Sequence, residues 1–225
     1  MASIYSIRSL AVTFAVVAAL WQSAAAQTTP IQLEDWYALK SVGEFSVSPD
    51  ARMTAFVVRE IDRAKDRRVG HLWRIATSGG NPERLTWEGS ASAPRYSPDG
   101  RYLAFVTTRH LESQKTPKKV AERGQVWVLP LAGGEAIPLT ALKEGVDSFE
   151  WSPDSKRLAV LSRDPREDDE EENEKVDKEE PPPPPIVITR LQHKQDGTGF
   201  LDGRRRHLYV LEAERALSAP GAAAE

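Results

Sequence analysis

Residues 96–105 read Tyr-Ser-Pro-Asp-Gly-Arg-Tyr-Leu-Ala-Phe, and the Ser-Pro-Asp core of this stretch occurs twice more in the chain. The three copies begin at Ser48, Ser97 and Ser152, at intervals of 49 and 55 residues. Proline fixes φ at the second position of a turn, and serine and aspartate side chains bond nearby backbone groups. Each copy therefore predicts a tight turn between two strands, repeated with a period of roughly 50 residues.

Strand-type sequence follows every turn. Residues 53–58, 102–107 and 158–162 are rich in β-branched and aromatic side chains, which favour a pleated, half-buried surface. A small residue recurs six positions after each turn proline: Ala55, Ala104 and Ala159. A small side chain at one fixed strand position predicts the close approach of a neighbouring sheet.

A third strand is predicted in each repeat, at residues 71–75, 125–129 and 207–211. In the first two repeats a glycine pair follows six residues after Trp73 and Trp127, and it predicts a hairpin turn into an outer fourth strand. We interpret both tryptophans as core residues. Four antiparallel strands in about 50 residues match a β-propeller blade. A β-sandwich, the competing all-β fold, does not require the same turn and tryptophan in every unit.

The third repeat is interrupted by an insertion at residues 163–185. Its segment 164–180 holds 11 acidic and 3 basic residues, and five prolines follow, a composition that predicts disordered coil and then polyproline II. Residues 186–189 have the sequence of a strand and residues 196–199 that of a turn, which together predict an added hairpin. Residues 213–225 form an alanine-rich stretch that we predict to be an unstructured tail.

The predicted fold class is therefore all-β: a partial β-propeller of about three four-stranded, TolB-like blades. The third repeat lacks the glycine pair and the fourth strand. Because propellers close with about four to eight blades, we expect a truncated product or a fragment of a longer protein. An open arc exposes strand edges, so we also expect self-association.

The first 26 residues have the pattern of a secretory signal peptide. Arg8 precedes an apolar run at residues 10–20, and Ala24-Ala25-Ala26 forms a small-residue cleavage site. The run is shorter than the roughly 20 residues that span a bilayer. We therefore expect an exported protein, periplasmic or secreted, with the propeller in residues 27–225 and no membrane span after cleavage. The alternative is a buried N-terminal helix.

The sequence excludes several kinds of catalytic site. The chain has no cysteine, so disulfides, thiolate metal sites and cysteine nucleophiles are absent. Serine hydrolases of the α/β type need Gly-x-Ser-x-Gly, but the only glycines four apart, Gly199 and Gly203, enclose Leu201. We therefore predict no catalytic residue, no cofactor and no activity for the chain alone. A formal charge of −3 gives no reason to expect nucleic-acid binding.

The histidines and the arginine run are interpreted structurally. His71 and His207 occupy the repeat position that holds Gln125 in the second repeat. A position that accepts histidine or glutamine indicates a hydrogen-bonding site rather than a metal ligand, so we predict no metal site. The run at residues 204–206 has no interleaved aromatic residues, and it predicts a solvated hairpin end paired with the acidic insertion.

Particular motifs resemble a known family. Residues 96–105 are similar to the repeat shared by TolB-type propellers and the propellers of the prolyl oligopeptidase family. Residues 185–191, followed by Asp196-Gly197 and residues 205–210, resemble the mid-propeller of bacterial dipeptidyl- and acylaminoacyl-peptidases in that family. Residues 33–37 are similar to their N-terminal segment.

The resemblance covers residues from about 31 to 212 and implies a function by analogy. In that family the propeller precedes an α/β-hydrolase domain with a Ser-Asp-His triad and restricts substrates to short peptides. Here we expect a gating propeller of an exported serine peptidase without its catalytic domain, so no catalytic residue is carried over. The alternatives are a stand-alone TolB-type propeller that binds proteins in the periplasm, and a non-functional truncated remnant.

Overall fold

The computed structural model describes residues 30–110, 120, 122–165, 188, 191–192, 194–196, 199–200 and 204–213. The predicted signal peptide lies outside this part, as do most of the acidic insertion and the tail after Ala213. The chain divides into two units, Met1–Tyr37 and Ala38–Glu225. A short helix, α2 (Asp35–Ala38), spans their boundary. Among the described residues, no helix has the length and apolar character needed to cross a membrane.

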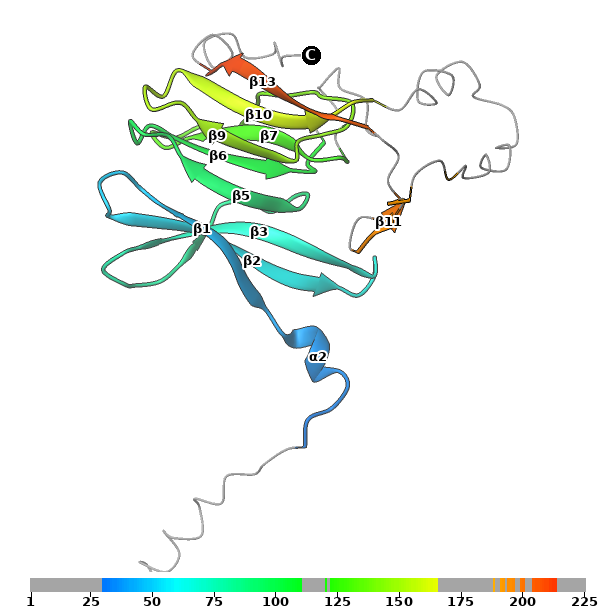
Figure 1. Cartoon of the computed structure of the whole chain (residues 1–225). Helices are drawn as coiled ribbons and strands as arrows, with labels where there is room; N and C mark the ends of the chain where they lie inside the picture. Colours follow the sequence, from blue (N-terminus) through cyan, green and yellow to red (C-terminus); the bar gives the residue numbers. More distant parts are fainter. Residues whose placement is uncertain are drawn as a thin grey trace, which may run out of the picture. The chain divides into compact units, whose positions relative to one another are not determined.

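The described part of the second unit contains three antiparallel sheets of four, four and three strands and a small two-stranded sheet, and Figure 1 shows the three larger sheets in chain order. We call them blades 1, 2 and 3. Blade 1 contains β1 (Ser41–Val47), β2 (Met53–Asp62), β3 (Arg67–Ala76) and β4 (Glu83–Arg84). Blade 2 contains β5 (Ala91–Tyr96), β6 (Tyr102–Thr107), β7 (Gln125–Pro130) and β8 (Ile137–Pro138). Blade 3 contains β9 (Ser148–Trp151), β10 (Arg157–Arg163) and β13 (Arg206–Glu212).

The Ser-Pro-Asp motifs form the turns between the first and second strands, as predicted. In the central copy the Ser97 hydroxyl donates to Asp99 Oδ1 at 2.6 Å, and Asp99 Oδ1 also accepts from the Arg101 N–H at 3.0 Å. The Tyr102 N–H donates to Ser97 Oγ at 3.0 Å, so side chains of the turn satisfy the backbone donors of Arg101 and Tyr102. The fourth residue of each turn has a positive φ: 56° at Ala51, 70° at Gly100 and 61° at Ser155.

The core lies between successive blades. We call the side of a blade that faces the next blade in chain order its forward face, and the opposite side its back face. One apolar cluster joins the forward face of blade 1 to the back face of blade 2, where Trp127 and Phe105 are buried. A second cluster joins the forward face of blade 2 to the back face of blade 3 through residues such as Val128 and Val160. The packing confirms the incomplete propeller and excludes the sandwich.

The recurrent alanines lie on forward faces. Ala55 and Ala104 are fully buried where the next blade packs, whereas Ala159, on blade 3, is half-buried. Trp127 is a core residue as predicted, and Trp73 at the equivalent position of blade 1 is half-buried. The position of a residue in the repeat thus fixes the direction of its side chain, while the burial of that side chain depends on whether a neighbouring blade packs on it.

The strand predictions hold best inside the repeats. The predicted outer strands are only two residues long, at β4 and β8. The added hairpin consists of β11 (Lys194–Gln195) and β12 (Gly199–Phe200) around the predicted turn. Ile188, the one described residue of the strand predicted at 186–189, lies in no strand.

Two ends of predicted segments are part of the packed structure. Arg163, the first residue of the predicted insertion, is the last residue of β10. Ala213, the first residue of the predicted tail, is fully buried in the second core cluster, and its N–H donates to the Lys156 carbonyl at 2.8 Å. The packed blade therefore extends one residue into each of these segments.

Candidate functional site

Antiparallel order places the connections of each blade at two opposite ends. The Ser-Pro-Asp turns and the glycine-pair turns lie at one end, because they join strands one to two and three to four. The links between strands two and three, and from one blade to the next, lie at the other end. We call this second end the connection end. The sequence segments between strands are longest at this end, and loops on a rigid scaffold often carry binding residues.

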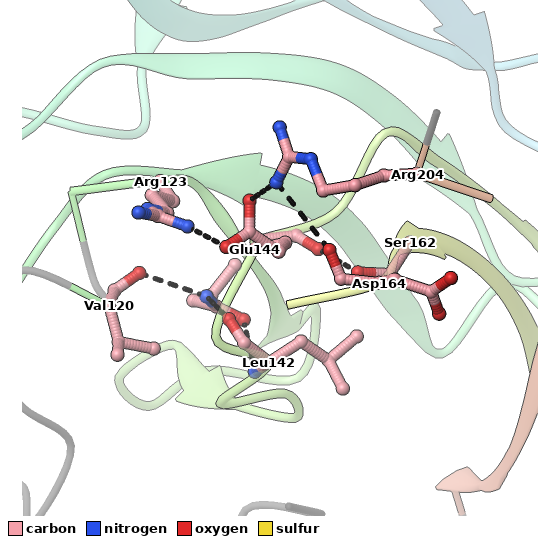
Figure 2. A network of polar contacts seen from close by, with 9 residues as sticks. Val120, Arg123, Leu142, Glu144, Ser162, Asp164 and Arg204 are labelled. Atoms are coloured by element: carbon pink, nitrogen blue, oxygen red, sulfur yellow. Dashed lines mark hydrogen bonds and ion pairs between the residues drawn. The ribbon is translucent and has the colours of Figure 1, made fainter. Parts of the chain in front are cut away.

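Two long segments of sequence begin and end at the connection end, and we call them the first and the second excursion. Residues 108–124 lie between β6 and β7, and residues 164–205 lie between β10 and β13. The link from blade 2 to blade 3, residues 139–147, passes the same end. The three segments meet at the polar network shown in Figure 2.

Glu144 is the centre of this network. Its Oε1 pairs with Arg123 Nη1, and its Oε2 accepts from Arg204 Nη1 at 2.6 Å. The side chain of Glu144 is 8% exposed, and a carboxylate so removed from water is stable in its charged form only when it is paired. Arg123 and Arg204 are each the last residue but one of their excursions, so a single carboxylate links the C-terminal ends of both excursions (Figure 2).

Gln125 links the same region through side-chain hydrogen bonds. Its Nε2 donates to the Val120 carbonyl at 3.0 Å and to the Leu142 carbonyl at 2.9 Å. Its Oε1 accepts from Thr140 Oγ1 at 2.8 Å and from the Leu142 N–H at 3.1 Å. All four hydrogen-bonding positions of this buried amide are satisfied, which holds the first excursion against the link between blades 2 and 3.

Asp164 closes the base of the second excursion. Its N–H donates to the Arg205 carbonyl at 2.9 Å, and its Oδ2 accepts from the Arg205 N–H at 3.3 Å. His207 Nε2 lies 2.7 Å from Asp164 Oδ1. Beside it, Asp147 pairs with Arg206 at 2.7 Å and with Arg163 at 3.5 Å. The excursion therefore starts and ends on fixed residues.

Gly145 allows the link to pass over the first excursion. Its φ is +73°, and a Cβ built on it would lie 2.1 Å from the Arg123 carbonyl oxygen. The neighbouring Val146 N–H donates to the Gly124 carbonyl at 3.0 Å. Only a residue without a side chain fits this contact, so the glycine is part of the arrangement that positions Glu144.

The repeat position that accepts histidine or glutamine is a polar-contact position in all three blades. Gln125 makes the four hydrogen bonds described above, and His207 pairs with Asp164. His71 is buried, and its Nε2 lies 3.6 Å from Glu60 Oε1. Burial, and then the nearby Arg84 guanidinium, lower the pKa of His71 despite the attraction of Glu60. The described residues include no group of three His, Cys, Asp or Glu side chains placed to hold a metal.

The arginine run at residues 204–206 agrees with the prediction only in part. Arg204 is half-buried and pairs with Glu144, and Arg206 pairs with Asp147, so both partners come from the link before β9. Within the described part of the acidic insertion, the Asp164 carbonyl accepts from Arg204 Nη1 at 3.5 Å, and the Asp164 carboxylate accepts from the Arg205 N–H at 3.3 Å. No sequence signal marks Glu144, because a single glutamate in a loop has no pattern and its two partners lie 21 and 60 residues away.

An aromatic side chain is exposed at the same end of blade 1. Trp87 lies in the link between β4 and β5 and is 68% exposed. The next residue, Glu88, pairs with Arg109 at the start of the first excursion at 3.4 Å. The connection end thus combines an exposed indole ring with a rim of paired charges.

Comparisons with known proteins find similarity to part of a peptidase. It is 29% identical over 192 residues to the uncharacterized peptidase YuxL of Bacillus subtilis, a match that covers 82% of this chain and 26% of that one. No model of a protein family matches the chain.

Solved structures with the same fold include the acylaminoacyl peptidase of Pyrococcus horikoshii, with a TM-score of 0.57 and 21% identity over 80% of this chain and 24% of that one. An acylaminoacyl peptidase bound to Z-Gly-Gly-Phe-chloromethyl ketone matches with a TM-score of 0.59 and 20% identity over 85% and 25% of the two chains. The chain spans about a quarter of the length of each of these relatives. The chain is thus similar in sequence to part of one peptidase and shares its propeller fold with part of the acylaminoacyl peptidases.

Proposed function

We propose that this chain is the N-terminal propeller region of an exported serine peptidase, and that its connection end restricts access to a separate hydrolase domain. The homology to a peptidase over 192 residues is the observation that carries the proposal. The chain itself contains no Gly-x-Ser-x-Gly motif, so the chemistry belongs to the hydrolase domain and the propeller selects what reaches it. The substrates are short peptides.

The polar network supports a selecting role for the connection end. A rim excludes large substrates only if its loops hold their positions, because loops that open freely admit any chain. Glu144 holds the C-terminal end of each excursion through Arg123 and Arg204. Gln125 joins the first excursion to the link between blades 2 and 3. These contacts fix the positions of end residues of both excursions at one end of the propeller.

The first experiment asks whether the chain alone has activity. Purified chain is treated with a fluorophosphonate probe that labels activated serines, and peptide and ester substrates are assayed in parallel. We expect neither labelling nor hydrolysis. Labelling that a single Ser→Ala substitution removes would show a nucleophile in this chain and would contradict the division of labour between propeller and hydrolase domain.

The second experiment asks whether a hydrolase domain accompanies the propeller. The transcript is read beyond the codon for Glu225, and the native product is sized by immunoblot. We expect an open reading frame with further Ser-Pro-Asp repeats and a Gly-x-Ser-x-Gly motif. A stop codon at this point, with a native product no larger than the 25.0 kDa of the whole chain, would leave the peptidase relationship as ancestry alone.

Selection by the connection end has its own readout in such a longer product. The variant Glu144→Gln releases the two excursions, so we expect kcat/KM to rise for long peptides while it stays unchanged for dipeptide-sized substrates. Glu150→Gln is the matched control, since Glu150 on β9 forms a largely exposed ion pair with Arg95 on β5. Equal effects on long and short peptides would contradict gating.

Export is tested at the N-terminus. Cell fractionation followed by N-terminal sequencing of the mature protein is expected to find the protein outside the cytoplasm, beginning at Gln27 after cleavage behind Ala26. An intact Met1 on protein retained in the cytoplasm would contradict export.

A further inference from the structure

We propose that the tip of a β-hairpin on blade 1 is a docking surface for an acidic run of the same chain, residues 167–172. The hairpin belongs to the described part of the chain, and the run, which lies outside it, enters through its sequence alone. This inference concerns a contact within the chain, and it does not depend on the peptidase function proposed above.

The hairpin is longer than its counterpart in blade 2. β2 and β3 have ten residues each, whereas β6 and β7 have six each. The pairing of β6 with β7 ends at Thr107 and Gln125. The corresponding pair in blade 1 is Val58 with His71, and four further residue pairs follow it. At about 3.3 Å per residue, these pairs extend the hairpin by about 13 Å at the connection end. We call residues 59–70 the arm.

The base of the arm is held on both of its strands. On β2, Glu60 Oε2 lies 3.1 Å from Lys40 Nζ. On β3, the Gly70 N–H donates to Ser90 Oγ at 3.0 Å, and a Cβ built on Gly70 would lie 2.4 Å from the Ala91 carbonyl oxygen. The arm therefore projects from a fixed base.

The tip of the arm, residues 63–68, is basic. Four of its six residues are lysine or arginine and one is aspartate, and all six are exposed. Within the described residues, Lys65 lies 3.7 Å from Asp62, whereas Arg67 and Arg68 have no carboxylate partner. Successive strand residues point to opposite faces, so a partner that reaches both arginines must pass over the tip. An extended acidic segment fits this requirement better than a flat surface does.

The chain itself contains such a segment. Residues 167–172 read Glu-Asp-Asp-Glu-Glu-Glu, which is six acidic residues in succession. The sequence predicts that the acidic insertion pairs with the arginine run, but Arg204 pairs with Glu144 and Arg206 pairs with Asp147. The arm tip offers basic groups at the same end of the propeller that are not engaged in this way.

The acidic run is close enough in sequence to its anchor to reach the arm. Asp164 is fixed at the connection end, where its N–H donates to the Arg205 carbonyl at 2.9 Å. The run ends eight residues after Asp164, and eight extended residues span up to about 28 Å. Packed sheets lie about 10 Å apart, so blades 1 and 3, with blade 2 between them, are separated by about 20 Å. The run can therefore lie over the tip while Asp164 stays in place.

The attraction depends on many charges acting together. A single exposed ion pair contributes little to stability, but the run brings several carboxylates to several basic side chains at once. Salt screens such exposed charges, and the screening length falls from about 10 Å at 0.1 M to about 3 Å at 1 M. Docking should therefore occur at low salt and be lost at high salt.

The first test uses the unaltered protein, expressed from its whole reading frame and treated at low salt with a carbodiimide that couples lysine amines directly to carboxylates. We expect mass spectrometry to find Lys65 joined to residues 167–172 at least ten times more often than Lys156. Lys156 is also exposed, but it follows a Ser-Pro-Asp turn at the opposite end. Coupling of Lys65 only to Asp62 or Asp66 of the arm, or to carboxylates of another segment, would overturn the proposal.

The second test traps the contact without changing any charge. The 225 residues contain no cysteine, so Ala64→Cys in the tip and Asn173→Cys beside the run form a defined pair. We expect their disulfide to form at least ten times faster than one between Asn173→Cys and Ser78→Cys, an exposed position at the opposite end of blade 1. Equal rates for the two pairs would refute docking at the arm.

Charge variants separate attraction from chance contact. Arg67→Glu/Arg68→Glu should slow formation of the arm disulfide at least tenfold, as high salt should, with an unchanged melting temperature because both side chains are exposed. Arg52→Glu/Lys156→Glu makes the same change in charge at the opposite end and should leave the rate unaltered. A rate that resists both high salt and the change at Arg67 and Arg68 would overturn the inference, because the contact would then not depend on the proposed charges.

Discussion

The backbone N–H of Asp99 donates a hydrogen bond to the Ser155 hydroxyl at 2.9 Å, and this contact joins the Ser-Pro-Asp turn of blade 2 to that of blade 3. Ser155 is the fourth residue of its own turn, where blade 2 has Gly100 and blade 1 has Ala51. The turns therefore do more than reverse the chain within one blade, because one of them also holds its neighbour.

Loss of this contact should destabilise the chain modestly. We expect Ser155→Ala to lower the free energy of unfolding by about 1 kcal/mol, since it removes one hydrogen-bond acceptor between blades. Urea denaturation gives the measurement. Ser148→Ala, at an exposed position on β9, is the control and should change stability by less than about 0.5 kcal/mol. Equal effects of the two substitutions would argue that the inter-turn contact contributes nothing.

The fourth turn position should favour glycine. Ala51 has a φ of 56°, and an L-residue pays conformational strain there that glycine does not. We expect Ala51→Gly to stabilise the chain by about 0.5–1 kcal/mol, after allowance for the greater freedom of glycine in the unfolded state. The reverse change, Gly100→Ala, should destabilise it, although a Cβ there would only meet Pro49 at 3.9 Å. Thermal melts of both variants test the sign, and opposite signs are required.

Removal of the Glu144 charge should cost far more than removal of an exposed partner. In Glu144→Gln the half-buried guanidinium groups of Arg123 and Arg204 lose their shared counter-charge, so we expect a loss of about 3 kcal/mol. Glu150→Gln breaks the exposed pair with Arg95 and should cost under about 1 kcal/mol. Chemical denaturation measures both losses in the free energy of unfolding, and equal losses for the two variants would contradict the prediction.

Stability should fall on mild acidification through His71. Its pKa in the folded chain is lowered by burial, so between that value and the ordinary histidine pKa of about 6.5 the unfolded chain binds a proton that the folded chain does not. Stability is therefore full above that range and decreases as the pH falls through it. We expect His71→Gln, which copies blade 2, to reduce the dependence. An identical pH profile for both proteins, from denaturation at pH 5–8, would contradict this assignment.

The aspartates of two turns should contribute at lower pH. Hydrogen bonds from the Ser48 and Ser152 hydroxyls lower the pKa values of Asp50 and Asp154. The stability that these carboxylates provide is present above the ordinary aspartate pKa and is lost as the pH falls through their lowered values. We expect the pH at the midpoint of acid unfolding to be higher in Ser48→Ala. NMR titration of the Asp50 carboxyl should show that the pKa of Asp50 is also higher in this variant.

The repeating part of the fold was predictable because its signals are local and recur. Ser97, Asp99 and their copies satisfy one another within six residues, so the turn follows from the motif itself. Strand order and face then follow from alternation. The outer strands were harder to predict, because a strand on the open edge of a blade has one partner and pairs over only two residues at Glu83–Arg84.

The connection end was beyond sequence reasoning for a different reason. Glu144, Arg123 and Arg204 belong to three loops without periodicity, and the blades bring them together only after they pack. The repeat did indicate Gln125 as a hydrogen-bonding position. It gave no indication that the same end would carry the two arginines and their shared carboxylate.

The packing of the blade faces also affects which blade unfolds locally first. Of the three blades described, blade 2 has both faces packed, while blades 1 and 3 each have one. In a linear array with nearest-neighbour coupling, opening begins at the ends and the middle element opens last. In the isolated 225-residue chain, amide hydrogen exchange should therefore be slowest in β6 and β7 and faster outward in both directions.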